Sequence, residues 1–211
     1  MSQKNDVHKE EVPMRTLWLM IFFATLVWSG IQPKDYPTWL LEVLPALIGF
    51  IVLAATRHRF PLTRLAYVLI LFHSVILMVG GHYTYAEVPL FDWIRDSFEL
   101  ERNNYDKVGH FVQGFVPAII AREILVRKAV VIGRSWLAFI VVCICLAISA
   151  FYELIEWWVA VFSAEAAEAF LGTQGYAWDT QSDMLFALMG SIVALLLLSG
   201  WHDRQIKRSV I

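Results

Sequence analysis

The stretch that decides the fold is Trp136–Phe162, WLAFIVVCICLAISAFYELIEWWVAVF. It runs from Trp136 to Tyr152 without a charged side chain. An α-helix of about 20 apolar residues spans the roughly 30 Å hydrocarbon core of a bilayer. Lipid offers no partner to backbone N–H and C=O groups, and a helix satisfies them within one segment. This stretch therefore predicts a transmembrane helix.

Five further segments are long and apolar enough to do the same. The chain has 211 residues, of which 58% are hydrophobic, whereas soluble domains average about 45–50%. We expect an all-α, polytopic integral membrane bundle of about six transmembrane helices in a lipid bilayer, forming a single domain over residues 1–211. The predicted spans are about 14–31, 38–56, 64–82, 107–126, 136–162 and 181–201, after a short polar N-terminal tail at 1–13.

Positive charge indicates how this bundle is oriented, because the cytoplasmic loops of membrane proteins are enriched in Lys and Arg. The side that carries both termini holds Lys4, Lys9, Arg15, Arg57, Arg59, Arg64, Arg127, Lys128, Arg134, Arg204, Lys207 and Arg208. The opposite side holds Lys34, Arg95, Arg102 and Lys107. We therefore expect both termini in the cytoplasm.

The overall charge and the cysteines exclude two classes of function. The formal net charge is −2 and no long basic run occurs, so we expect no nucleic-acid partner. Cys143 and Cys145 lie two positions apart and point to different faces of a helix, unlike the C-x-x-C of redox and zinc sites. We interpret both as core residues.

Two loops on the predicted outer side have features of their own. Within residues 91–102, Phe91, Ile94 and Phe98 recur at helical spacing, which predicts an amphipathic helix on the outer membrane surface. The loop at 163–179 contains glycines and no basic residue, and it is long enough to fold over the helix ends. We predict that it forms a lid.

Polar side chains gather at one depth of the predicted bundle. Three sets recur at helical spacing, so that each occupies one helix face: Asp106, His110 and Gln113; Glu153 and Glu156; Asp179 and Asp183. The fourth span enters from outside, the fifth ends outside and the sixth begins outside, so the predicted topology brings these sets to the same side. Lys107 and His82 lie at that depth as well. Ionisable groups within spans are costly and usually face a cavity or the bundle interior.

Carboxylates packed near hydrocarbon need compensating positive charge, and a divalent metal ion is one way to supply it. Asp, Glu and His are standard ligands of zinc, manganese and iron, whereas carboxylates suit magnesium and calcium. The candidate metal ligands are His82, Asp106, His110, Glu153, Asp179 and Asp183. The candidate catalytic residues are Glu153, Glu156 and Lys107, and Gln113 would support the site.

Three polar features have other interpretations. The acidic pairs could bridge helices inside lipid, where polar contacts hold bundles together, in a non-catalytic scaffold or accessory protein. A small ion or proton transporter would need polar groups through the full membrane depth, which only Glu42 and His73 offer here. Arg122 and Glu123, near the inner end of the fourth span, are interpreted as snorkelling to the cytoplasmic interface.

Three motifs resemble a known family: Tyr105–Pro117 (YDKVGHFVQGFVP), Tyr152–Trp158 (YELIEWW) and Phe170–Met184 (FLGTQGYAWDTQSDM). Through them the chain resembles, over most of its length, the YjdF family of predicted bacterial inner-membrane proteins. The resemblance implies a multi-pass protein of the bacterial inner (cytoplasmic) membrane. That family has no established activity, so the resemblance implies location more than chemistry.

A more distant similarity is to the VanZ-like family, which is associated with glycopeptide-resistance accessory proteins of the cell envelope. It rests on Asp-Lys-x-x-His-Phe at 106–111, on Glu153, and on the acidic pair at 179–183. The Glu-Trp-Trp extension at 156–158 and the longer loop at 163–179 depart from that family.

These observations favour an outward-facing His/Asp/Glu pocket that binds a cation or a polar lipid headgroup. The leading hypothesis is a metal-dependent hydrolase or transferase acting on envelope lipids or cell-wall intermediates. In this hypothesis Lys107 contacts a substrate anion such as phosphate.

Overall fold

The computed structural model describes residues 2–162 and 174–209, and in these ranges every regular element is an α-helix. The helices are α1 (Ser2–Gly30), α2 (Tyr36–Thr56), α3 (Arg64–Tyr83), α4 (Pro89–Ser97), α5 (Tyr105–Arg127), α6 (Arg134–Phe162) and α8 (Asp179–Ser209). The predicted all-α fold is confirmed. Residues 163–173, most of the loop predicted as a lid, lie outside the described residues.

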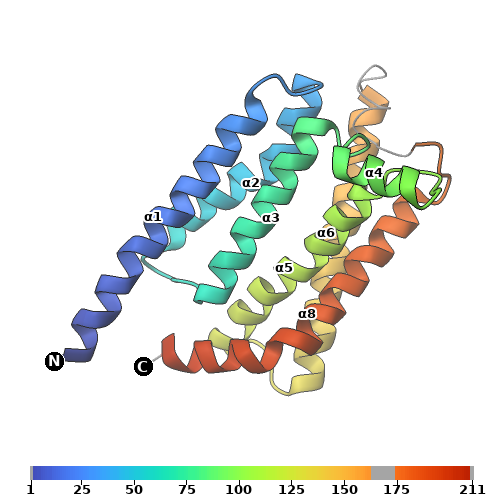
Figure 1. The fold of residues 1–211 in the computed structure, drawn as a ribbon. Helices are drawn as coiled ribbons and strands as arrows, with labels where there is room; N and C mark the ends of the chain where they lie inside the picture. The colour runs from blue at the N-terminus through green and yellow to red at the C-terminus, as the bar shows by residue number, and fades with distance from the viewer. Residues whose placement is uncertain (1, 163–173, 210–211) are drawn as a thin grey trace.

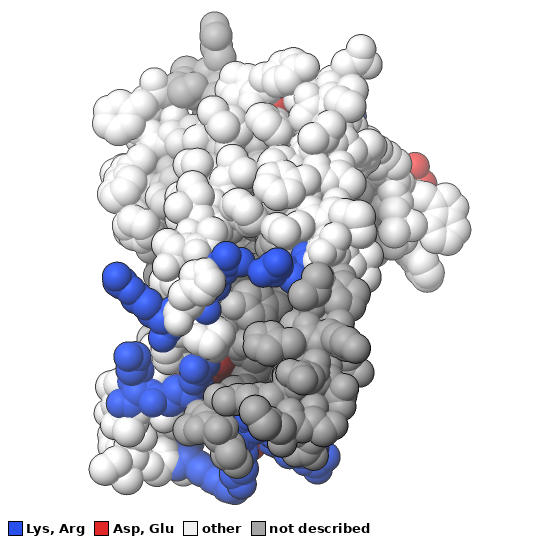
Figure 2. All heavy atoms as spheres, turned by 90° about the vertical axis from the view of Figure 1, so that its left-hand side faces the viewer, with Lys and Arg blue, Asp and Glu red and all other residues white. Residues whose placement is uncertain are grey.

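The helices have the length and composition of a membrane bundle. Helices α2, α3, α5, α6 and α8 are long and apolar enough to cross a bilayer, and the apolar stretch Met14–Gly30 of α1 is shorter. Helix α1 lies alongside α3, and both termini lie at the same end of the molecule (Figure 1). Lys and Arg gather toward that end of the face shown in Figure 2. The protein is thus a polytopic helical membrane protein, and the cytoplasmic location of its termini stays a prediction.

Local sequence explains where the first helices begin and end. Helix α1 continues back to Ser2, through the segment predicted as a polar tail. Helix α2 begins at Tyr36 because the Asp35 side chain accepts a hydrogen bond from the Thr38 amide at 2.8 Å. Helix α3 ends where Thr84 adopts a left-handed conformation, with φ of 59°.

The amphipathic helix on the predicted outer side is shorter than the sequence indicates. Helix α4 ends at Ser97, because Glu99 takes a left-handed φ of 52° and the chain turns back toward α5. Trp93 and Phe98 are exposed, whereas Phe91 packs its ring edge on Tyr105 at 5.2 Å between ring centroids. This arrangement suits a helix at the membrane–water interface, where exposed aromatic rings are favourable.

Among the described helices, α5 and α8 make the most extensive contact, and two glycines make this approach possible. A Cβ at Gly114 would lie 1.8 Å from the carbonyl oxygen of Ala187. A Cβ at Gly190 would lie 2.0 Å from the carbonyl oxygen of Phe111. Small residues allow membrane helices to pack backbone against backbone. The crossing holds the polar face of α5 directly against the start of α8.

At the end that carries the termini, the snorkelling interpretation is wrong for both residues. Glu123 is fully buried and accepts hydrogen bonds from the Thr63 amide at 2.9 Å and from His202 Nε2 at 3.1 Å. Arg122 is also buried and forms an ion pair with Asp203. The reason is that α8 continues past the predicted end of its span to Ser209, and its last turns lie across the end of the bundle (Figure 1).

Candidate functional site

The first two turns of α5 carry the centre of the site. Asp106, Lys107 and His110 are all buried there. His110 Nε2 lies 3.4 Å from Asp106 Oδ1, and His110 Nδ1 lies 3.2 Å from Gln113 Oε1. These contacts follow from the i, i+4, i+7 spacing, which places the three side chains on one helix face.

Helix α8 brings two carboxylates to the same place. Lys107 Nζ donates to Asp179 Oδ1 at 2.5 Å and to Asp183 Oδ1 at 2.6 Å, and it lies 3.6 Å from Asp106 Oδ2. Asp183 Oδ1 is also 3.9 Å from His110 Nε2. Both aspartates are buried, so these ion pairs are little screened by solvent.

Helix α6 adds two buried glutamates, one turn apart. Glu153 Oε1 lies 3.7 Å from His110 Nδ1, beyond hydrogen-bond distance. It has no hydrogen-bond partner within the described part of the chain, although the residue is only 7% exposed. Glu156 is 8% exposed and lies on the same helix face. A buried carboxylate oxygen without a donor is rare in native proteins and requires an explanation.

Two sets of three residues have the spacing of a metal site. One is Asp106, His110 and Asp183, and the other is His110, Glu153 and Glu156. Within each set, the ligand atoms lie within 4.8 Å of one another. Bonds of about 2.0–2.2 Å to a zinc-like ion would place ligand atoms within about 4.4 Å, so modest side-chain movement suffices. His110 belongs to both sets.

Two members of the site were not predicted from the sequence as site residues. Arg102 precedes α5, and its guanidinium lies 2.5 Å from Asp179 Oδ1 and 3.6 Å from Asp106 Oδ2. Glu42 of α2 is buried, accepts a hydrogen bond from the Tyr152 hydroxyl at 3.3 Å, and is within electrostatic reach of Asp106. Glu42 lies far from the motifs in sequence, and only the packing of α2 brings it to the site. Arg102 lies just before the first motif and reaches Asp106 at i, i+4 spacing.

The charges of the site do not balance. We use the name polar cluster for the carboxylates of Glu42, Asp106, Glu153, Glu156, Asp179 and Asp183 together with the basic groups of Arg102, Lys107 and His110. Six carboxylates thus face three basic groups, one of which is a histidine. Taking such excess charge out of water is costly unless protons or a cation compensate it.

The structure places His82 outside the polar cluster. Its Nδ1 lies 3.0 Å from the carbonyl oxygen of Ser29, and its ring packs on Trp28 with centroids 4.6 Å apart. The His82 side chain therefore faces α1. His82 therefore does not join the other candidate ligands.

A buried tyrosine outside the spans supports the cluster. The ring of Tyr85 fills the space beside Gly80 and Gly109, where an added Cβ would meet it at 2.1 Å and 2.8 Å. Burial, and to a lesser degree the nearby Glu42, raises the pKa of the Tyr85 phenol well above its ordinary value. The ring is therefore an uncharged wedge between α3 and α5.

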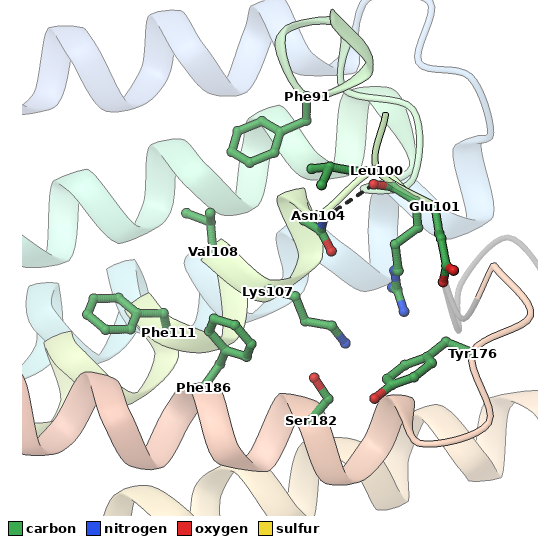
Figure 3. A pocket seen from close by; sticks show the side chains of 11 residues that line it. Phe91, Leu100, Glu101, Asn104, Lys107, Val108, Phe111, Tyr176, Ser182 and Phe186 are labelled. Atoms are coloured by element: carbon green, nitrogen blue, oxygen red, sulfur yellow. Dashed lines mark hydrogen bonds between the residues drawn. The ribbon is translucent and has the colours of Figure 1, made fainter. Parts of the chain in front are cut away.

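A pocket of 740 Å³ opens beside the cluster, between the start of α5, the start of α8 and the segment after α4. Lys107 and Arg102 contribute positive charge and Glu101 contributes negative charge. Ser182 and Tyr176 contribute hydroxyl groups beside Lys107 (Figure 3). The remaining walls are largely apolar and include Phe91, Leu100, Val108, Phe111 and Phe186. We refer to it as the outer pocket, since it lies at the end predicted to face outward.

Comparison with known proteins gives two matches that cover most of the chain. The family model "Predicted membrane protein (DUF2238)" matches residues 14–204. Inner membrane protein YjdF of Escherichia coli (strain K12) is 54% identical over 183 residues, which is 87% of this chain and 88% of that protein. This confirms the resemblance to the YjdF family, whereas the VanZ-like similarity stays a prediction. No solved structure matches the chain.

Proposed function

Since the chain belongs to the DUF2238 family of predicted membrane proteins and lies in the bacterial inner membrane, we propose a function within that membrane. The polar cluster binds a divalent cation, and the outer pocket holds the anionic headgroup of an envelope lipid or a lipid-linked cell-wall intermediate next to it. The protein would be a metal-dependent hydrolase or transferase.

The observation that carries this proposal is the buried carboxylate oxygen of Glu153 that has no hydrogen-bond donor within the described residues. This oxygen, Oε1, faces His110 at 3.7 Å across a cluster with excess negative charge. A cation between the two side chains would give this oxygen a partner and offset the excess charge. Water alone would satisfy the oxygen and leave the charge uncompensated, and compensation by protons would leave the wild type metal-free, which the metal measurement below distinguishes.

The chain's own residues have separable roles in this proposal. His110 is the shared ligand, and its Nδ1 would exchange the contact with Gln113 Oε1 for the cation when Glu153 ligates the ion. A bound divalent cation would supply Lewis-acid activation of a phosphoryl or carbonyl oxygen and would favour ionisation of a bound water. Glu153 and Glu156 are then positioned to take or return a proton.

The outer pocket supports a lipid with an anionic headgroup as the ligand. Arg102 and Lys107 can both donate to a phosphate, and a guanidinium does so with two parallel hydrogen bonds. In the described structure both basic groups are occupied by Asp179, so a phosphate would compete with that carboxylate. The apolar walls from Phe111 and Phe186 suit the lipid chain.

Metal content tests the proposal. The protein is purified in mild detergent without chelator or metal-affinity tag, and bound metals are measured by mass spectrometry. We expect about one divalent ion per chain in the wild type and a loss of that ion in the His110→Ala, Glu153→Ala double variant. The matched control is His58→Ala, Asp96→Asn, which removes one exposed histidine and one exposed acid that belong to neither ligand set.

Two outcomes would contradict the proposal. The first is a wild-type protein that stays metal-free after incubation with zinc, manganese or magnesium. The second is a double variant that keeps its metal. If the ion is present, phosphate release from phospholipids and lipid diphosphates in mixed micelles distinguishes a hydrolase from a transferase or a non-catalytic binding protein.

One set of contacts favours a second candidate, a non-catalytic accessory protein. Lys107 and Arg102 connect α5 and the segment before it to α8 through Asp179, which is how polar groups hold membrane helices together. In that case the Glu153→Gln, Asp183→Asn variant loses folded protein in detergent and the wild type binds no metal. Transport is not supported to the same degree, because the residues between His73 and the inner end line a pocket whose walls are mainly apolar.

A further inference from the structure

A second pocket, of 460 Å³, lies in the half of the bundle nearer the termini and is separate from the polar cluster. It is bordered by α2, α3 and α5. Helix α2 packs against α3, and α3 packs against α5, so the face of α3 forms the floor between the other two helices. We refer to it as the inner pocket.

The walls of the inner pocket are mainly apolar. They include Leu53 and Val52 from α2, Ile70 from α3, and Val116 and Ile120 from α5. A pocket of this size and lining fits small apolar ligands, whose usual sites measure about 300–1,000 Å³. Inside a bilayer the available ligand of this kind is an acyl chain.

Two basic residues border the same pocket. Arg59 lies in the turn after α2, and Lys128 directly follows α5. Lys128 Nζ lies 5.6 Å from the centre of the Phe60 ring, which also lines the pocket. None of the residues that line this pocket is acidic. The border therefore attracts an anion at the level where the apolar walls end.

The position of these two basic residues suits the anionic headgroups of the cytoplasmic leaflet. Basic pockets between transmembrane helices on the cytoplasmic side bind the headgroups of anionic lipids. The predicted topology places Arg59 and Lys128 on that side. A zwitterionic lipid such as phosphatidylcholine would fit the apolar walls, but its quaternary ammonium group would lie near the same two basic residues and cancel the charge of its phosphate.

We propose that the inner pocket is a binding site for an anionic phospholipid of the cytoplasmic leaflet. One acyl chain lies against α2, α3 and α5, and the lipid phosphate lies between Arg59 and Lys128. This site is independent of the polar cluster and of the function proposed for it.

Lipid retention tests this site. The protein is reconstituted in nanodiscs of equal parts phosphatidylglycerol and phosphatidylcholine, released into detergent, and examined by native mass spectrometry. We expect the wild type to retain phosphatidylglycerol in preference to phosphatidylcholine. The Arg59→Gln, Lys128→Gln variant should bind phosphatidylglycerol about 30-fold more weakly, since each basic group near the surface contributes about 1 kcal/mol.

Two further variants separate a specific site from general surface charge. Arg57→Gln, Arg134→Gln removes two basic groups on the same side that do not line the pocket, and it should retain the lipid as the wild type does. Gly49→Leu places a side chain in the pocket where an added Cβ meets nothing within 4 Å, so the fold should survive while lipid retention is lost.

Three results would overturn the inference: equal retention of both lipids by the wild type, equal loss in the two charge variants, or undiminished retention in Gly49→Leu. Inorganic phosphate at millimolar concentration should not displace the lipid, because it lacks the acyl chain that the apolar walls hold, and displacement would be a fourth contradicting result.

Discussion

Lys107 Nζ lies 2.5 Å from Asp179 Oδ1, although the two residues belong to different helices, α5 and α8. Both side chains are about 7% exposed. The pair therefore links the fold to the proposed chemistry, since the same ammonium group connects two helices and borders the outer pocket.

Replacing Lys107 by methionine should destabilise the protein strongly. The change leaves the carboxylates of Asp179 and Asp183 without their shared donor, and breaking a buried ion pair in this way costs about 3–5 kcal/mol. Unfolding in mixed detergent, followed by tryptophan fluorescence, measures the loss. The control is Lys34→Gln, which breaks the exposed pair with Glu87 and should cost less than about 1 kcal/mol. Equal effects of the two variants would contradict a buried ion pair.

Gly114→Ala should prevent the close crossing of α5 and α8. Its Cβ would lie 1.8 Å from the backbone oxygen of Ala187, and a backbone atom cannot move aside without shifting the helix. We expect little folded protein by size-exclusion chromatography. Gly49→Ala is the matched control, because its Cβ meets nothing within 4 Å, and it should be neutral or stabilising by about 0.5–1 kcal/mol. A well-folded Gly114→Ala protein would mean that the two helices lie further apart.

Glu123→Gln should loosen the end of α8. The Glu123 carboxylate accepts hydrogen bonds from Thr63 and His202 and forms an ion pair with Arg127. The uncharged Gln side chain of the variant makes weaker bonds to these groups, which lowers the stability of the folded protein by about 1–3 kcal/mol. Faster trypsin cleavage after Arg204 would report the loosening. Glu99→Gln, on the opposite side of the membrane and exposed, should leave cleavage unchanged. Identical cleavage of both variants would favour the snorkelling interpretation.

Ser182→Leu should block the outer pocket without removing the metal. Ser182 lies beside Lys107 and Tyr176 at the pocket wall (Figure 3), and it belongs to neither proposed ligand set. We expect unchanged metal content and binding of a lipid phosphate weakened at least about tenfold, which corresponds to about 1.4 kcal/mol. Gln181→Leu, an exposed neighbour, is the control. Loss of metal in Ser182→Leu would place the ion in the pocket itself.

Reporter fusions test the orientation. A fluorescent protein fused after Ile211 should fluoresce, because we expect the C-terminus in the cytoplasm. Alkaline phosphatase inserted after Glu99, in the segment between α4 and α5, should be active, because that segment is predicted to face outward. The reverse pattern would invert the bundle and place the polar cluster on the cytoplasmic side.

Most of the candidate site could be predicted because its residues lie at helical spacing. Asp106 and His110, Glu153 and Glu156, and Asp179 and Asp183 each share a helix face, and in each pair both side chains are buried in the same cluster. Spacing within a helix is a local property, and it does not depend on which helices pack together.

The predicted and observed site differ where a residue contacts a helix that the sequence pattern does not indicate. His82 lies at the expected depth, but its side chain faces Ser29 of α1. Glu42 is the sole charged residue of α2, and Arg102 lies four residues before Asp106, just outside the first motif. The close crossing of α5 and α8 does have a pattern in the sequence. Small residues recur at four-residue spacing in both helices, at Gly114 and Ala118 and at Gly190 and Ala194, which is typical of closely packed membrane helices.

The sequence by itself determined the helical membrane fold, because apolar runs of spanning length have one favourable conformation in lipid. It also determined which carboxylates share a face. The tertiary structure decided which faces meet: the contact of Gly114 with Ala187 sets how far α8 slides along α5, and that distance brings Lys107 to Asp179. Small residues at four-residue spacing mark the helix faces that can pack closely, but which of these faces meet depends on side-chain packing between distant segments.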